Sequence, residues 1–79
     1  MLGLMKARNK QEFVASLGKR VAVVRKRYDI TQEKLAELAE LDRMTIALIE
    51  TGKKRPSVVT VYKLARALKV EPQEFFKDL

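Results

Sequence analysis

The sequence predicts an all-α fold of five helices, and three observations lead to it. Hydrophobic residues make up 47% of the chain, with only three Gly and two Pro, which is typical of a folded domain. Apolar residues recur every three or four positions, without the alternation expected of strands. A helix-capping side chain precedes each periodic segment. At 79 residues the chain is long enough for one domain, which we place at residues 9–79 after a flexible basic leader at residues 1–8.

The first helix begins at Asn9, because Glu12 follows three residues later in the form of a capping box. It is expected to end before Asp29, a residue type that tolerates a left-handed backbone. Its buried face is predicted to hold Phe13, Val14, Leu17, Val21, Val24 and Tyr28.

Two short helices follow, and their spacing has the form of a helix-turn-helix. Thr31 is expected to cap a helix over Gln32–Ala39, and Asp42 a helix to about Glu50 that ends at Gly52. Small residues at Ala36 and Ala39 allow a close crossing above Leu35, Ile46 and Ile49. The outer strip of the third helix, which would meet the DNA major groove, is then Arg43, Met44, Ala47, Leu48 and Thr51.

The last two helices are predicted from Ser57 and Pro72. Ser57 can cap a helix that runs through Leu68, and Pro72 suits the first position of a short helix that carries Phe75 and Phe76.

The charge of the chain favours a polyanionic partner. Lys and Arg number 17 against 10 Asp and Glu, and the net charge is +7. The absence of Cys and His excludes disulfides, the usual zinc sites and thiol or imidazole catalysis. We therefore expect no enzyme activity, cofactor, metal or small-molecule ligand. No apolar run is long enough for a membrane span or a secretion signal, which favours a cytoplasmic protein.

Several motifs at fitting separations resemble the phage repressor and Cro type of helix-turn-helix protein, the Xre family, over roughly Leu17 to Phe76. The motifs are Leu17-Gly18-Lys19-Arg20-Val21, Arg25, Thr31-Gln32-Glu33-Lys34-Leu35-Ala36, Ile46, Ile49-Glu50, Thr51-Gly52-Lys53, Pro56-Ser57 and Leu64-Ala65-Arg66-Ala67-Leu68. Leu41-Asp42-Arg43 ahead of Ile46 is further similar to the small controller proteins of restriction-modification systems, which are dimeric regulators of similar length. The resemblance implies a compact fold like that of lambda repressor.

The resemblance also implies roles for single residues. Gln32 would bond a DNA phosphate and brace a side chain of the recognition helix, unless it is only an ordinary first helical residue. Arg43 would donate to guanine O6 and N7, with a phosphate contact as the alternative. Thr45 matches a position that touches phosphate. Glu40 stands where the family commonly has Gly, which costs about 1 kcal/mol if its φ is positive.

Met44 and Leu48 depart from the polar residues of many relatives, and they could pack on thymine methyl groups. Leu48 could equally turn toward the core or a partner, and Leu38 is expected to be buried or to self-associate. Lys53, Lys54 and Arg55 would follow the phosphate backbone, unless they form only a solvated loop. The expected DNA-binding set is Thr31, Gln32, Arg43, Met44, Thr45, Ala47, Leu48, Thr51, Lys53, Lys54 and Arg55.

Arg25 and Glu50 each border the apolar stripe of their helix, so we expect them to form an ion pair with a structural role. The resemblance supports this pairing between the first and third helices. A second basic group at Lys19, Arg20, Lys26 and Arg27 is interpreted as the solvated face of the first helix.

These observations predict a sequence-specific transcriptional regulator that binds double-stranded DNA. It would bind an inverted-repeat operator as a homodimer, with its third helix in the major groove. Candidates for the subunit contact are Val59, Val70, Phe75, Phe76 and Leu79, with closure of the monomer core as the alternative for Phe75 or Phe76. The other hypothesis is a protein-interaction module, antitoxin-like or an anti-repressor partner, with Met44, Ala47 and Leu48 as its binding face.

Overall fold

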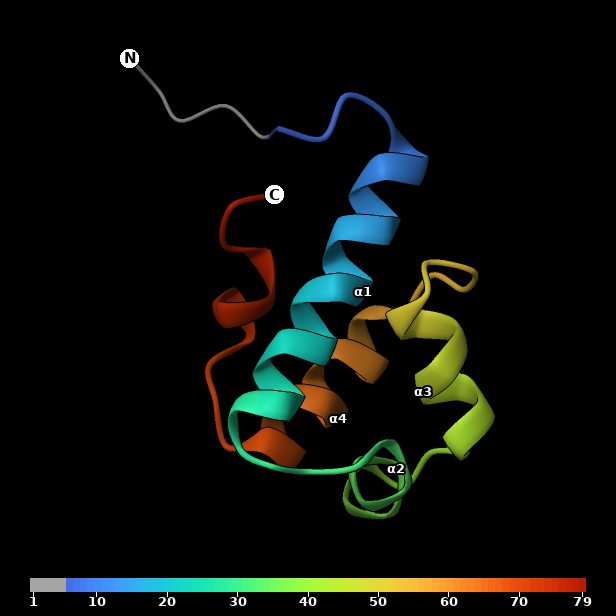
Figure 1. Ribbon diagram of the computed structural model, residues 1–79, viewed down its shortest axis with the longest axis vertical. Helices are drawn as coiled ribbons and strands as arrows, with labels where there is room; N and C mark the ends of the chain where they lie inside the picture. Colours follow the sequence, from blue (N-terminus) through green and yellow to red (C-terminus); the bar gives the residue numbers. More distant parts are fainter. Residues whose placement is uncertain (1–5) are drawn as a thin grey trace.

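The computed structural model describes residues 6–79, which form four α-helices and one 3₁₀ helix and include no strand. The elements are α1 (Lys10–Arg27), α2 (Gln32–Ala39), α3 (Arg43–Glu50), α4 (Val58–Leu68) and η1 (Pro72–Phe76), arranged as in Figure 1. The prediction of an all-helical fold is confirmed. The fifth element is a 3₁₀ helix of five residues rather than an α-helix, as is usual for such short segments.

Three of the predicted N-caps are present. The side chain of Asn9 accepts a hydrogen bond from the Glu12 N–H, at 2.9 Å. The hydroxyl of Thr31 accepts from the Lys34 N–H at 3.0 Å, and that of Ser57 does the same for α4. Because these caps are formed within four residues, the sequence locates the helix starts well.

Two details of the capping predictions are wrong. Asp42 lies at the N-cap position of α3 with extended backbone, but its side chain makes no capping hydrogen bond. The Glu12 carboxylate accepts from the N–H of Arg8, one residue before the cap, so the reciprocal bond of a capping box is displaced.

Left-handed residues end the helices at the predicted turns. Asp29 has a φ of 56° after α1, Glu40 a φ of 58° after α2, and Gly52 a φ of 76° after α3. Lys69 ends α4 in the same conformation, with a φ of 58°. Glu40 and Lys69 therefore hold a backbone conformation that costs a residue with a Cβ roughly 1 kcal/mol.

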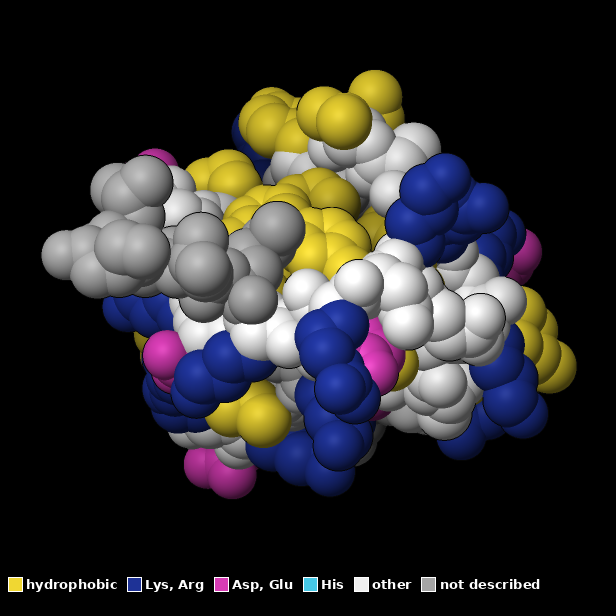
Figure 2. Space-filling model, turned by 90° about the horizontal axis from the view of Figure 1, so that it is seen from above, with side chains coloured by type: hydrophobic (Ala, Val, Ile, Leu, Met, Phe, Trp, Pro, Cys, Tyr) yellow, Lys and Arg dark blue, Asp and Glu magenta, His cyan; other side chains and the backbone are white. Residues whose placement is uncertain are grey.

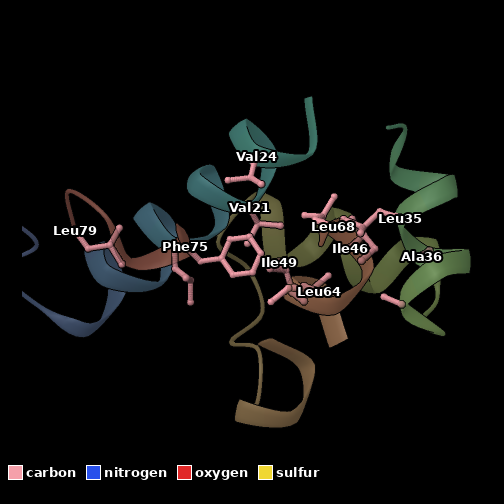
Figure 3. Close-up of a cluster of buried hydrophobic side chains, with 13 residues drawn as sticks. Val21, Val24, Leu35, Ala36, Ile46, Ile49, Leu64, Leu68, Phe75 and Leu79 are labelled. Carbon is pink, nitrogen blue, oxygen red and sulfur yellow. The ribbon is translucent and has the colours of Figure 1, made fainter. Parts of the chain in front are cut away.

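The core lies between α1, which packs against α3, α4 and η1, and α2, which packs against α3 and α4. Figure 3 shows its side chains converging from all five elements. The buried members are Leu17, Val21, Val24, Leu35, Ala36, Ala39, Ile46, Ile49, Leu64, Ala65, Leu68, Phe75 and Leu79. Tyr28, predicted to be buried, is 49% exposed, because it follows the last helical residue of α1 and leaves the apolar stripe.

The C-terminal segment folds against α1, which corrects the predicted subunit contact of Leu79 and favours the core alternative for Phe75. Phe75 and Leu79 are 0% and 5% exposed within the single chain. Arg20 Nε donates to the Glu74 carbonyl at 2.8 Å, and the Ala7 N–H donates to the Leu79 carbonyl at 2.7 Å. Phe75 and Leu79 thus close the monomer core. Residues 1–5 of the expected leader lie outside the described residues.

Two glycines allow α1 to lie close to the end of α3. A Cβ at Gly18 would overlap the carbonyl oxygen of Ile49, and one at Gly52 would lie 2.9 Å from the Cα of Ala15. The helix-turn-helix is therefore fixed against α1 by backbone contact as well as by side chains.

Candidate nucleic-acid interface

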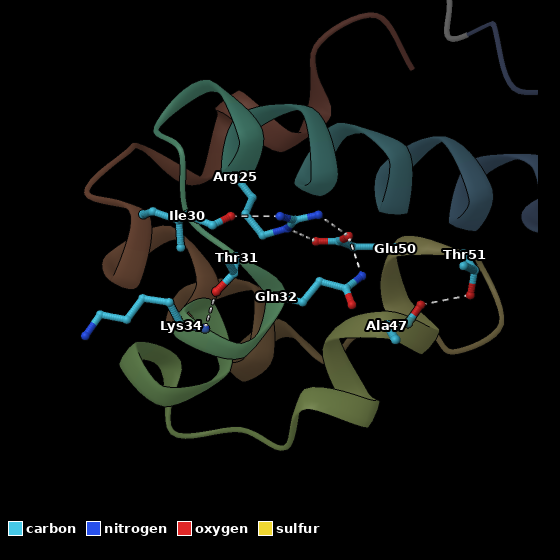
Figure 4. A network of polar contacts seen from close by, with 8 residues as sticks. All are labelled: Arg25, Ile30, Thr31, Gln32, Lys34, Ala47, Glu50 and Thr51. Atoms are coloured by element: carbon cyan, nitrogen blue, oxygen red, sulfur yellow. Dashed lines mark hydrogen bonds and ion pairs between the residues drawn. The ribbon is translucent and has the colours of Figure 1, made fainter.

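A buried polar network holds the C-terminal end of α3 (Figure 4). Arg25 donates to both carboxylate oxygens of Glu50, with 2.7 Å from Nε to Oε2 and 3.0 Å from Nη2 to Oε1. Its third nitrogen, Nη1, donates to the Ile30 carbonyl at 2.7 Å. The two side chains are only 10% and 5% exposed. The predicted ion pair between the first and third helices is therefore confirmed.

Gln32 extends this network to α2. Its Nε2 donates to Glu50 Oε1 at 3.0 Å, so the first residue of α2 is bonded to the last residue of α3. Arg25 ties the same carboxylate to α1. One carboxylate thereby sets the position of α3 relative to both preceding helices, and Gln32 braces α3 as the resemblance implied.

The side of α3 opposite the core is exposed to solvent at its beginning. Arg43 and Met44 are exposed, and Met44 is 66% exposed despite its apolar side chain. Thr45, Ala47 and Leu48 are partly buried. Leu38 on α2, predicted to be buried or to self-associate, is 45% exposed within the single chain.

The segment after α3 folds back on the end of that helix. The Thr51 hydroxyl donates to the Ala47 carbonyl at 2.9 Å, and the N–H groups of Lys53 and Lys54 donate to the Leu48 carbonyl at 2.8 and 3.2 Å. The side chains of Lys53, Lys54 and Arg55 are exposed, and within residues 6–79 none of them forms an ion pair. We call these three residues the basic loop.

The molecular surface carries two kinds of patch at the end where α1 begins. Figure 2 shows a band of hydrophobic side chains there, with groups of Lys and Arg side chains beside it. The most exposed apolar residues of α4 are Val58, Val59 and Tyr62, at 86%, 61% and 54%.

In the part of the chain that the structure describes, no helix has the length and hydropathy to cross a membrane.

A short braced helix with an exposed outer face, followed by a loop of cations without ion-pair partners, is the arrangement typical of helix-turn-helix DNA-binding proteins. The chain belongs to the helix-turn-helix family HTH_3, the Xre type, whose sequence pattern matches residues 21–75.

Relatives of known sequence are transcriptional regulators. An uncharacterized HTH-type transcriptional regulator from Archaeoglobus fulgidus is 37% identical over 57 residues, which cover 72% of this chain and 81% of that protein. The HTH-type transcriptional regulator PuuR of Escherichia coli is 33% identical over 61 residues, and the match spans only 33% of its length. These relatives belong to a class of DNA-binding regulators and not to a class of enzymes.

Solved structures extend the likeness to restriction-modification controller proteins. C.AhdI from Aeromonas hydrophila superposes with a TM-score of 0.79 at 38% identity, covering 80% of this chain and 96% of that one. Wild-type C.Esp1396I superposes with a TM-score of 0.76 at 25% identity, covering 82% and 84%. The family and the controller-like subgroup predicted from the sequence are both supported by these matches.

Three features of this surface were not predicted from the sequence. Gly18 lies inside α1, where glycine costs about 1 kcal/mol relative to alanine, so its position was itself a sign of close backbone approach. The resemblance implied that Gln32 braces a side chain of the recognition helix, but no local signal identified Glu50 as its partner. Val58 and Tyr62 were not singled out, although their exposure exceeds that of Phe76, at 43%.

Proposed function

We propose that this protein binds double-stranded DNA sequence-specifically, with α3 in the major groove, and regulates transcription from an inverted-repeat operator as a homodimer. The observation that carries the proposal is the arrangement of α3. Its C-terminal end is fixed by the Glu50 carboxylate, and its first turn presents an exposed Arg43.

The exposure of Arg43 supports a role in reading a base. Its guanidinium can donate two parallel hydrogen bonds to guanine O6 and N7, a contact that discriminates guanine by roughly 1–3 kcal/mol. The basic loop at the other end of α3 would neutralise phosphates. The other proposed DNA contacts flank or belong to α2 or α3, and they are Thr31, Gln32, Met44, Thr45, Ala47, Leu48 and Thr51.

The exposed apolar face of α4 supports the homodimer. A subunit contact through this face would bury Val58, Val59 and Tyr62 away from water. Of the two η1 residues predicted to lie at the subunit contact, Phe76 is the one that is exposed. Val70 packs partly against the monomer core. Exposed apolar patches of this kind mark interaction surfaces, and two recognition helices read twice as many base pairs as one.

Selection of bound duplexes from a random pool tests the proposal. We expect a paired, inverted-repeat motif for the wild type and loss of preference at one symmetric position for Arg43→Ala. Lys26→Ala is the charge-matched control, because it removes one exposed cation of α1 and should keep the full motif. If Arg43→Ala keeps the full motif, Arg43 is not a reader.

The exposure of Met44 favours the second candidate function, a protein-interaction module with Met44, Ala47 and Leu48 as its binding face. A salt titration separates the two. Phosphate neutralisation makes log K fall with log salt by about 0.9 per contact, whereas an apolar protein interface changes little.

A further inference from the structure

The outer face of α3 has few polar groups with which to read bases. Met44 is exposed, and Ala47 and Leu48 are partly exposed beside it on the same helix. We call these three residues the apolar strip. Arg43, one residue before it, supplies the only charged side chain on this face.

Two polar groups at the C-terminal end of the apolar strip, those of Thr51 and Glu50, are already engaged. The Thr51 hydroxyl donates its proton to the Ala47 carbonyl, and it lies 3.3 Å from the Leu48 carbonyl as well. Glu50 is bonded to Arg25 and Gln32, with its side chain 5% exposed. The C-terminal half of α3 therefore offers DNA mainly carbon atoms.

Apolar atoms can make only one favourable contact with base edges in the major groove. Apolar atoms that contact N7, O6, O4 or an amino group displace water from these polar atoms without replacing its hydrogen bonds, which costs free energy. The C5-methyl group of thymine is the apolar exception. The same methyl group, at the same carbon of a pyrimidine, is present in 5-methylcytosine.

We propose that the apolar strip is a binding site for pyrimidine C5-methyl groups, and that operator affinity depends on them. This inference rests on the proposed function, since it requires α3 to enter the major groove. The charges around the strip favour DNA as its partner: Arg43 at one end can donate to a guanine, and the basic loop at the other end can neutralise phosphates.

The test uses the operator obtained by selection. Each thymine is replaced in turn by deoxyuridine, which removes the methyl group and changes no hydrogen-bonding atom. We expect about a fourfold loss of affinity for each methyl group that meets the apolar strip, from the hydrophobic contribution of one carbon. Unchanged Kd values at every thymine would overturn the proposal.

Protein variants assign each methyl group to a side chain. Met44→Ala should abolish the deoxyuridine penalty at one position in each half-site, and Leu48→Ala the penalty at a neighbouring one. Val23→Ala is the matched control, because Val23 is a 48% exposed apolar residue on α1, and it should keep every penalty. The deoxyuridine series is measured with the wild-type protein, so its result remains valid even if Leu48→Ala folds poorly. Penalties that persist in both strip variants would contradict the assignment.

Two further duplexes distinguish the sources of the methyl group. At a sensitive position, thymine paired with adenine is replaced by cytosine or 5-methylcytosine paired with guanine. Recovery of about fourfold with 5-methylcytosine supports a site that senses cytosine methylation, whereas equal affinities support a site restricted to thymine.

Failure of this inference is distinct from failure of the proposed function. If a motif is selected and depends on Arg43 while deoxyuridine has no effect, only the methyl site is wrong. If no duplex is bound even at low salt, both are wrong.

Discussion

Two groups of ion pairs join α1 to later parts of the chain, and they differ in burial. Arg25 and Glu50 have side chains 10% and 5% exposed and share a bidentate contact. Glu74 on η1 is 24% exposed and has cations of 20–54% exposure around it. These are Arg20 at 3.7 Å, Arg27 at 3.6 Å and Lys77 at 2.9 Å.

The difference shows that similar charges serve different purposes in this fold. A buried, hydrogen-bonded pair is costly to break, because the charge that remains is buried with neither a partner nor water to solvate it. A partly exposed cluster gains little, because water screens each pair. The Glu50 network thus fixes the helix proposed to read DNA. The Glu74 cluster links η1 to α1 and contributes little to stability.

The largest expected effect follows from breaking the buried pair on one side. Arg25→Met or Glu50→Leu alone should lower the free energy of unfolding by about 3 to 5 kcal/mol, and the double variant by less than either. Urea denaturation measures all three. Arg27→Met in the Glu74 cluster is the control and should change stability little. Two folded single variants with wild-type melting would refute this prediction.

An intermediate effect is expected where the network reaches α2. Gln32→Ala removes the hydrogen bond to Glu50 Oε1 and should lower stability by about 1 kcal/mol in the absence of DNA. The loss should shrink when Glu50 is already replaced by Leu, since the acceptor is then gone. Equal losses in both backgrounds would show that the bond contributes nothing.

The smallest effect is expected at Glu74 and depends on pH. The hydrogen bond from Lys77 lowers the pKa of Glu74 from its ordinary value of 4.5; burial opposes this, and the charges of Lys77, Arg27 and Arg20 add to the lowering. The stabilisation is therefore complete above the unfolded-state pKa and is lost as the pH falls through the lower folded-state value.

Thermal melting of Glu74→Gln measures this contribution. The variant should melt slightly below the wild type at neutral pH, and the difference should vanish in acid. Glu71→Gln, an exposed residue of the same turn, should melt like the wild type throughout. A difference for Glu74→Gln that persists at acid pH would rule out the ion pairs as its cause.

The sequence predicts those parts of this fold that depend on near neighbours. Thr31 and Ser57 cap helices within three residues, so α2 and α4 begin where their hydroxyls indicate. Asp29 and Glu40 adopt the left-handed turns that their places between helices require. The Arg25–Glu50 pair was also predictable, because both residues border apolar stripes and match a family pattern.

Contacts between distant segments were harder to predict. Phe75 and Leu79 were both candidates for the subunit contact, with the monomer core as an alternative for Phe75 alone. Only the path of the chain after Pro72 buries them against the rest of the core. Glu74 meets Arg20 across 54 positions, with no periodicity to indicate it. The exposure of Val58 on α4 likewise depends on which side of that helix faces the core.

The most direct test of the account concerns the major groove, which alone exposes guanine N7. The guanine that selection assigns to Arg43 is replaced by 7-deazaguanine, which removes that acceptor and leaves base pairing intact. We predict that the wild type loses affinity by about tenfold, and that Arg43→Ala loses nothing further. Equal wild-type affinity for both duplexes, or equal losses for both proteins, would contradict the claim that α3 reads DNA through this groove.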